Sequence, residues 1–151
     1  MRRVVITGMG IVSSLGTNQK EVAQSLRESR SGIGFSEEAR DNGLRSHICG
    51  QINLNLPELI DRKLWRFMCP ASGYTYLAML EAIEQAGLTD EHIKADTTGI
   101  IFGQGGASTV ELLDSIDTHR DRGIRRVGPY RVPRTMGSAI DASQATGFYR
   151  K

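Results

Sequence analysis

The sequence predicts an α/β domain with parallel strands, because a strand, a glycine turn and a helix follow one another twice. The first β-branched run, Val4-Val5-Ile6, ends at the turn containing Gly8 and Gly10. The second run, residues 98–103, enters the glycine-rich turn 103–106. In folds of this class, ligands bind at the turns that follow the carboxyl ends of the strands.

Two helices are predicted between these strands. Asn18 and Glu21 resemble a capping box, and the apolar residues that follow at helical spacing predict a helix over about 19–29. The strongest helical pattern runs from about residue 70 to residue 86 and stops at Gly87. The polar stretch between them predicts only loops, turns and short strands.

The last third of the chain combines one more helix with irregular segments. Ser108 and Glu111 form a capping box, which predicts a helix after the second glycine turn. Two prolines after Gly123 favour an extended loop. The small-residue segment 136–146 predicts a helix that packs closely against another backbone or a partner subunit.

Length and composition are those of a single globular domain: 151 residues, 39% hydrophobic and 24% charged. Two cysteines cannot supply a disulfide framework or a four-ligand zinc site, so we expect a cytoplasmic protein with reduced thiols and no metal. The apolar start is disfavoured as a signal peptide because glycines interrupt it and no A-x-A-like cleavage site follows. No apolar run reaches the roughly 20 residues that span a membrane.

The formal charge of +2 hides an asymmetry. Residues 120–134 contain six arginines and one aspartate, a net charge of +5, so the rest of the chain sums to −3. A second basic cluster follows Asp61, where Arg62 and Arg66 would share one face of a helix. Such clusters fit either a solvated surface or a patch for an acidic protein partner, and we expect no nucleic-acid partner.

The glycine turns do not by themselves identify a cofactor site. A dinucleotide fingerprint would need a third glycine where Ser13 stands, and turn 103–108 lacks the lysine of a P-loop. This second turn could still offer N–H groups to an anion or let a hydrophobic ligand approach the backbone. We therefore expect no cofactor.

The histidines and cysteines do not form a catalytic pattern. His47, His92 and His119 have no partner at metal or triad spacing, which favours surface or capping roles. Cys49 and Cys69 are interpreted as small buried apolar residues. No set of nucleophile, base and oxyanion donors can be assembled from this sequence.

The order and spacing of several segments resemble those of a known family. They are Arg3 to Gly16, Arg30 to Ile33, Leu44 to His47, Ile60 to Met68, Gly103 to Gly106 and Val127 to Tyr130. Together they resemble the amino-terminal part of the β-ketoacyl-acyl-carrier-protein synthases, most of all the synthase I group of bacterial type II fatty-acid synthesis. The resemblance implies a thiolase-like fold, an αβαβα sandwich in the complete enzyme, with residues 1–151 as its amino-terminal part.

The resemblance also implies an activity and its partners. Such synthases are homodimers that take an acyl group from acyl carrier protein onto a cysteine, decarboxylate malonyl-carrier protein and join the two. That cysteine, two histidines and a lysine correspond to positions after Lys151, so no catalytic residue is assigned here and the chain alone is expected to be inactive. The alternative is a noncatalytic module for carrier-protein binding or dimerisation.

Noncatalytic roles can be assigned by the same resemblance. The expected docking residues for acidic carrier protein are Arg62, Lys63, Arg66, Arg122 and Arg125. The expected acyl-pocket residues are Gly105, Gly106 and Met136, with Met136 reaching across the dimer interface. Residues 143–147 depart from the apolar residues and proline usual in the family.

Overall fold

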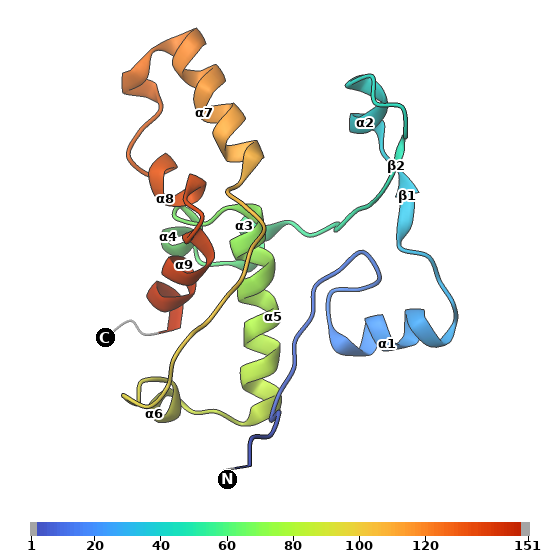
Figure 1. Ribbon diagram of the computed structural model, residues 1–151, viewed down its shortest axis with the longest axis vertical. Helices are drawn as coiled ribbons and strands as arrows, with labels where there is room; N and C mark the ends of the chain where they lie inside the picture. Colours follow the sequence, from blue (N-terminus) through green and yellow to red (C-terminus); the bar gives the residue numbers. More distant parts are fainter. Residues whose placement is uncertain (1–2, 149–151) are drawn as a thin grey trace. The chain divides into compact units, whose positions relative to one another are not determined.

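A computed structural model describes residues 3–148 of the chain (Figure 1), so the last residues of the expected 1–151 domain lie outside the described residues. The described residues form two compact units. The first unit comprises residues 3–54 and Leu77–Gly87, and the second comprises Asn55–Tyr76 and residues 88–148. No described helix is long and apolar enough to cross a membrane.

The first unit contains a small sheet and three helical segments. Its elements are α1 (Gln19–Arg27), β1 (Ile33–Phe35), α2 (Glu37–Asp41), β2 (Ile48–Gly50) and the last part of α5 (Pro70–Ala86). Strands β1 and β2 pair antiparallel, with Phe35 opposite Ile48. This pair is the only sheet among residues 3–148, so the prediction of parallel strands is wrong for the described chain.

Both segments predicted as buried strands expose apolar side chains, and neither pairs with a strand among residues 3–148. Val4 is 94% exposed, Ile6 is 84% exposed, and Ile101 in the second segment is 96% exposed. Neither segment is assigned as a strand. A β-branched run favours an extended backbone, but its burial requires a neighbouring strand, which the local pattern does not specify.

The segment after Ile6 is held against α5 by backbone contacts. Met9 N donates to Gln85 Oε1 at 2.7 Å, and Ile11 N donates to Glu81 Oε2 at 3.0 Å. At Gly10, an added Cβ would lie 1.7 Å from the carbonyl oxygen of Ala78. The first glycine turn is therefore a close packing contact with a helix.

Helix α1 begins close to its predicted start, but only half of the predicted capping box forms. Asn18 Oδ1 accepts from Glu21 N at 3.0 Å, whereas the Glu21 carboxylate accepts from Thr17 N at 2.7 Å and from Thr17 Oγ1 at 3.0 Å. The backbone hydrogen bond from Thr17, followed by the side-chain bonds of Thr17 and Asn18, lowers the pKa of Glu21.

The lowered pKa of Glu21 predicts acid sensitivity at the start of α1. The ionised carboxylate stabilises the fold above the ordinary glutamate pKa of about 4.3, and this contribution is lost as the pH falls through the lower folded value. Hydrogen exchange of the α1 amides should therefore accelerate on acidification, and Glu21→Gln should reduce this dependence. An equal acid response in the variant would contradict the prediction.

The second unit is mostly helical. Its elements are α3 (Leu56–Leu59), α4 (Arg62–Trp65), the start of α5, α6 (Asp90–Ile93), α7 (Thr109–Arg122), the 3₁₀ turn η1 (Ile124–Arg126), α8 (Arg131–Thr135) and α9 (Ala139–Phe148). Its core is formed by apolar residues at most 8% exposed, namely Leu56, Ile60, Leu64, Met68, Cys69, Ala139 and Ile140. Gly73 on α5 faces this cluster, since an added Cβ would meet Trp65, Leu56 and Ile60.

Two segments of the second unit are more helical than predicted. Residues 53–57 were expected to form a loop, yet Pro57 lies at the beginning of α3. The proline-containing stretch after Gly123 was expected to be extended, yet it forms η1 and α8. Both prolines of these helices lie in the first turn, where the backbone N–H has no helical acceptor to lose.

The predicted small-residue helix forms as α9 and contains a buried glutamine. Gln144 is 0% exposed, and its Nε2 donates to the carbonyl oxygen of Ser72 at 2.9 Å. Its Oε1 is buried without a partner among the described residues. A buried acceptor that has lost its water costs about 1–3 kcal/mol.

Replacing Gln144 by leucine should stabilise the second unit. The change removes the unpartnered oxygen and keeps a similar side-chain volume, while the Ser72 carbonyl oxygen loses its hydrogen bond from Gln144. We expect the free energy of unfolding in urea to rise by about 1 kcal/mol. The exposed Gln51→Leu should change it by less than about 0.5 kcal/mol, and a destabilised Gln144→Leu variant would contradict the argument.

Candidate functional site

Three of the five expected docking cations lie on or directly after α4, a short helix that is fixed by an N-cap and by one core residue. Asp61 Oδ1 accepts from Lys63 N at 2.8 Å and from Leu64 N at 3.3 Å. Leu64 points into the core, which leaves Arg62 and Lys63 exposed, and the following Arg66 is exposed too. None of these three cations pairs with a carboxylate among residues 3–148. Their charge is available to a partner.

An aromatic cluster fixes the end of this basic segment. Arg66 donates to the Tyr130 hydroxyl at 3.2 Å, and its guanidinium lies 5.1 Å from the centroid of the Tyr130 ring. Phe67 meets the same ring edge to face at a centroid distance of 5.1 Å. The position of Arg66 is thereby set by the segment that precedes α8.

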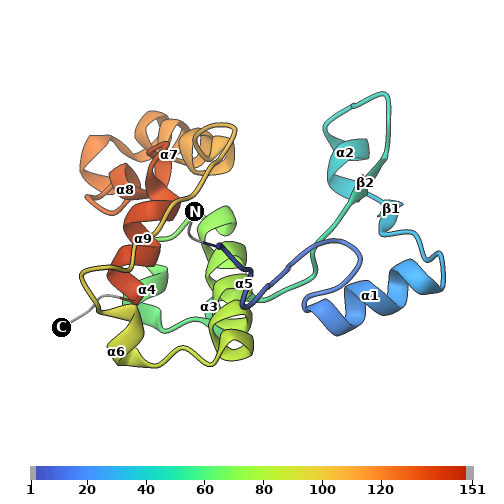
Figure 2. The ribbon, with the colours of Figure 1, turned by 60° about the horizontal axis from the view of Figure 1, so that its bottom comes forward.

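The other two expected docking cations lie apart from α4. Arg122 ends α7 and Arg125 lies in η1, and both are exposed. Figure 1 shows the C-terminal end of α7 pointing away from α4 within the second unit, and Figure 2 shows α7 beside α8 in the same unit. The structure therefore presents two basic groups and does not bring all five residues together.

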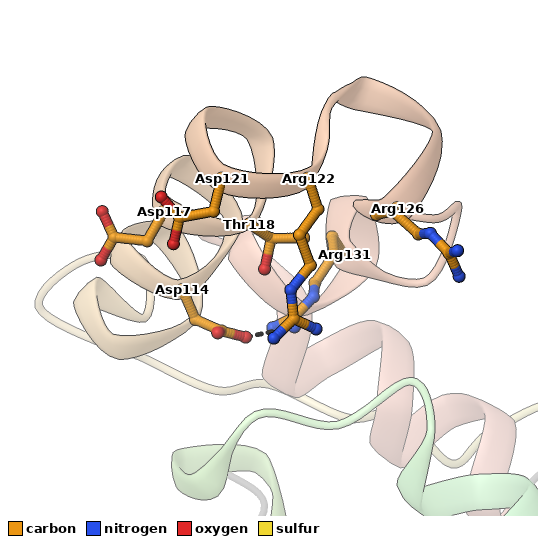
Figure 3. A pocket seen from close by; sticks show the side chains of 7 residues that line it. All are labelled: Asp114, Asp117, Thr118, Asp121, Arg122, Arg126 and Arg131. Atoms are coloured by element: carbon orange, nitrogen blue, oxygen red, sulfur yellow. Dashed lines mark ion pairs between the residues drawn. The ribbon is translucent and has the colours of Figure 1, made fainter.

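Arg122 shares a polar cavity of about 420 Å³ with acidic side chains (Figure 3). The lining residues are Asp114, Asp117, Thr118, Asp121, Arg122, Arg126 and Arg131. Three carboxylates and three guanidinium groups line the cavity, so their formal charges cancel. The attraction of Arg122 for an acidic partner is consequently weaker than that of the α4 cations, whereas Arg125 does not line this cavity.

The expected acyl-pocket residues are exposed and lie on two segments that one glutamine side chain connects. Gln104 Nε2 donates to the carbonyl oxygen of Gly137 and to that of Met136, the latter at 3.4 Å. This contact links the residue before Gly105 to the backbone at Met136, whose own side chain is exposed, at 47% for the residue. Atoms added at either glycine would meet nothing within 4 Å, which leaves room for a ligand close to the backbone.

A buried carboxylate on α7 has a role that the sequence did not predict. Glu111 is 5% exposed, and its oxygens lie 2.9 Å from Arg131 Nη1 and 2.5 Å from Arg134 Nη2. Arg131 also pairs with Asp114. Ser108 caps α7 as predicted, accepting from Glu111 N at 3.4 Å, but the Glu111 side chain turns to α8 instead of completing the capping box.

The cysteines and histidines have the structural surroundings that the sequence favoured, with one exception. Cys69 is buried and lies 3.3 Å from Ser72 Oγ, whereas Cys49 is exposed and the prediction of its burial is wrong. His92 caps α6 by contacting Thr89, and His47 packs edge to face on Phe35. Among residues 3–148, no group of three potential ligands could hold a metal ion.

Comparisons with known proteins identify the family. Residues 1–147 match the family model described as the N-terminal domain of beta-ketoacyl synthase. The chain therefore belongs to the β-ketoacyl synthase family. Over 98% of its length it is 49% identical to 3-oxoacyl-(acyl-carrier-protein) synthase 1 of Escherichia coli K12, and it spans 37% of the length of that relative.

Solved structures show that the fold is shared. A crystal structure of a beta-ketoacyl synthase from Burkholderia phymatum matches 99% of this chain and 37% of its own, at 24% identity and a TM-score of 0.84. A type II PKS ketosynthase, solved with its acyl-carrier protein and a bound hexaketide, matches 100% of this chain and 40% of its own, at 18% identity and a TM-score of 0.73. The thiolase-like fold class predicted from the sequence is confirmed.

Proposed function

We propose that the chain is the amino-terminal part of a β-ketoacyl-acyl-carrier-protein synthase of fatty-acid synthesis. The reaction is the decarboxylative Claisen condensation of an acyl thioester with malonyl-carrier protein. The observation that carries this proposal is the 49% identity to a 3-oxoacyl-(acyl-carrier-protein) synthase 1 along 98% of the chain. The proposal includes a cytoplasmic homodimer, with residues 1–151 forming an incomplete part of the catalytic domain.

The contribution of this chain is to hold the carrier protein and part of the acyl chain. Arg62, Lys63 and Arg66 are exposed and unpaired by any described carboxylate, which suits an acidic protein surface. Arg125 and, more weakly, Arg122 extend the basic surface. A ketosynthase of the same fold has been solved in complex with its acyl-carrier protein, which supports this kind of partner.

The glycine turn and Met136 are proposed to line the acyl chain. Gly105 and Gly106 have no atoms within 4 Å of an added Cβ, so a hydrocarbon chain can lie against their backbone. Met136 would add a flexible apolar side chain, which is exposed in this chain. The nucleophile and the decarboxylation histidines are not assigned to residues of this chain.

Charge reversal on α4 tests the docking role. We expect the double variant Lys63→Glu/Arg66→Glu to weaken salt-sensitive binding of acidic acyl carrier protein by about 2 kcal/mol, roughly thirtyfold in Kd. Isothermal titration at two salt concentrations measures this, because raising the salt screens the same interaction.

The matched control is Lys20→Glu/Arg27→Glu on α1, where two exposed cations are reversed in the first unit. This control changes the net charge by the same amount and should bind like the unsubstituted chain. Equal weakening by both double variants would remove the specific role of α4.

A further inference from the structure

Glu111 joins α7 to α8 through a buried ion-pair cluster. A carboxylate that is 5% exposed is costly unless its charge is compensated, and here two guanidinium groups compensate it. Arg131 and Arg134 approach different oxygens of the carboxylate, at 2.9 and 2.5 Å. The two arginines are three residues apart on one short helix, so both can reach the same acid only while α8 keeps its orientation.

Arg134 continues this cluster to α4. Its guanidinium lies 6.0 Å from the centroid of the Trp65 ring, the last residue of α4. Its Nε is buried without a hydrogen-bond acceptor among the described residues. Arg134 is therefore held by Glu111 on one side and by the aromatic face on the other, with no further acceptor fixing it.

Helix α8 touches the α4 segment at both of its ends. Tyr130 at its start packs on Arg66 and Phe67, and Arg134 near its end lies over Trp65. Met136 follows immediately as the C-cap of α8. The basic helix and the methionine are thus joined by one short helix, whose orientation depends on Glu111.

We propose that Glu111 is a positioning residue that fixes α4 and Met136 relative to each other through α8. A protein that docks on α4 would then alter the surroundings of Met136 without touching it. The identity of that docking protein rests on the proposed function, whereas the positioning by Glu111 does not.

The free chain provides the first test. Trp65 is the only tryptophan, so its fluorescence reports the Arg134 contact, and a ¹³C-methyl label reports Met136 by NMR. Glu111→Gln keeps the shape of the side chain and removes its charge, and it should shift both signals. Glu37→Gln, an exposed glutamate on α2, is the matched control and should shift neither. Unchanged Trp65 and Met136 signals in Glu111→Gln would overturn the proposal.

Titration with acidic acyl carrier protein provides the second test. In the unsubstituted chain, the Trp65 and Met136 signals should change at the same carrier-protein concentration, with one titration midpoint. In Glu111→Gln, the Trp65 response should remain while the Met136 response is lost. A Met136 response of undiminished size in the variant would overturn the coupling. If the unsubstituted chain does not bind, the proposed function fails, and the free-chain comparison still decides the role of Glu111.

A substitution that keeps the charge guards against loss of folding. Arg134→Lys retains a cation for Glu111 but lacks the planar group that lies on Trp65. If Glu111→Gln loses its cooperative thermal transition, the titration is made with Arg134→Lys as the test variant. The Met136 response to carrier protein should be lost in this variant too. If the cluster only stabilises the fold, the substitution should lower the melting temperature and leave the Met136 response intact. That outcome would contradict the proposal.

Discussion

Gly10→Ala is expected to destabilise the first unit by at least about 3 kcal/mol, near the upper end of what single substitutions cause. The new Cβ would lie 1.7 Å from the carbonyl oxygen of Ala78 and 2.6 Å from its carbonyl carbon. Both are backbone atoms of α5, so no side-chain rotation relieves the clash. Separating the two segments would also break the hydrogen bonds from Met9 N to Gln85 and from Ile11 N to Glu81.

Urea unfolding, monitored by circular dichroism, measures this effect, and Gly34→Ala is the matched control. Gly34 lies in β1, and a Cβ added there meets nothing within 4 Å. The control should change the free energy of unfolding by less than about 1 kcal/mol, the usual cost or gain of glycine replacement. A Gly10→Ala chain that unfolds at the same urea concentration as the control would show that α5 does not pack on Gly10.

Helices were predictable from the sequence because their signals are local. Asn18 and Ser108 cap the helices that were expected after them, and Gly87 follows α5 with a φ of +65°, a conformation that favours glycine. Apolar spacing within 17 residues was sufficient to place α5. Strands depend on partners elsewhere in the chain, so the β-branched run at Val4 could not reveal that no strand pairs with it, and the prediction of its burial is wrong.

The site was predictable to the extent that it is made of consecutive residues. The α4 cations are visible as a charge cluster, and their exposure follows from the inward direction of Leu64. The Glu111 cluster joins residues separated by 20 and 23 positions, so only the folded chain reveals it. One sequence signal was available: Arg131 and Arg134 stand three residues apart in a region rich in arginine, and a buried acid is one way to hold such a pair.

Met68→Ala should produce the largest loss of stability in the second unit, about 3 kcal/mol. Met68 is 0% exposed and is the largest of the fully buried side chains described. The two helices that precede it, α3 and α4, contain four residues each and cannot persist alone. The placement of these helices therefore depends on the packed core, and a cavity at Met68 has few other contacts to offset it.

Unfolding of this unit can be followed through Trp65, which packs beside Gly73 next to the core. Met68→Leu keeps most of the volume and should cost less than about 1.5 kcal/mol, which separates the effect of the cavity from that of losing methionine itself. Because the α4 cations depend on the same core, Met68→Ala should weaken carrier-protein binding only near its lowered melting temperature. Weaker binding well below that temperature would mean that Met68 shapes the docking surface directly. If the free energy of unfolding falls by less than about 1 kcal/mol, the core closes around the missing side chain.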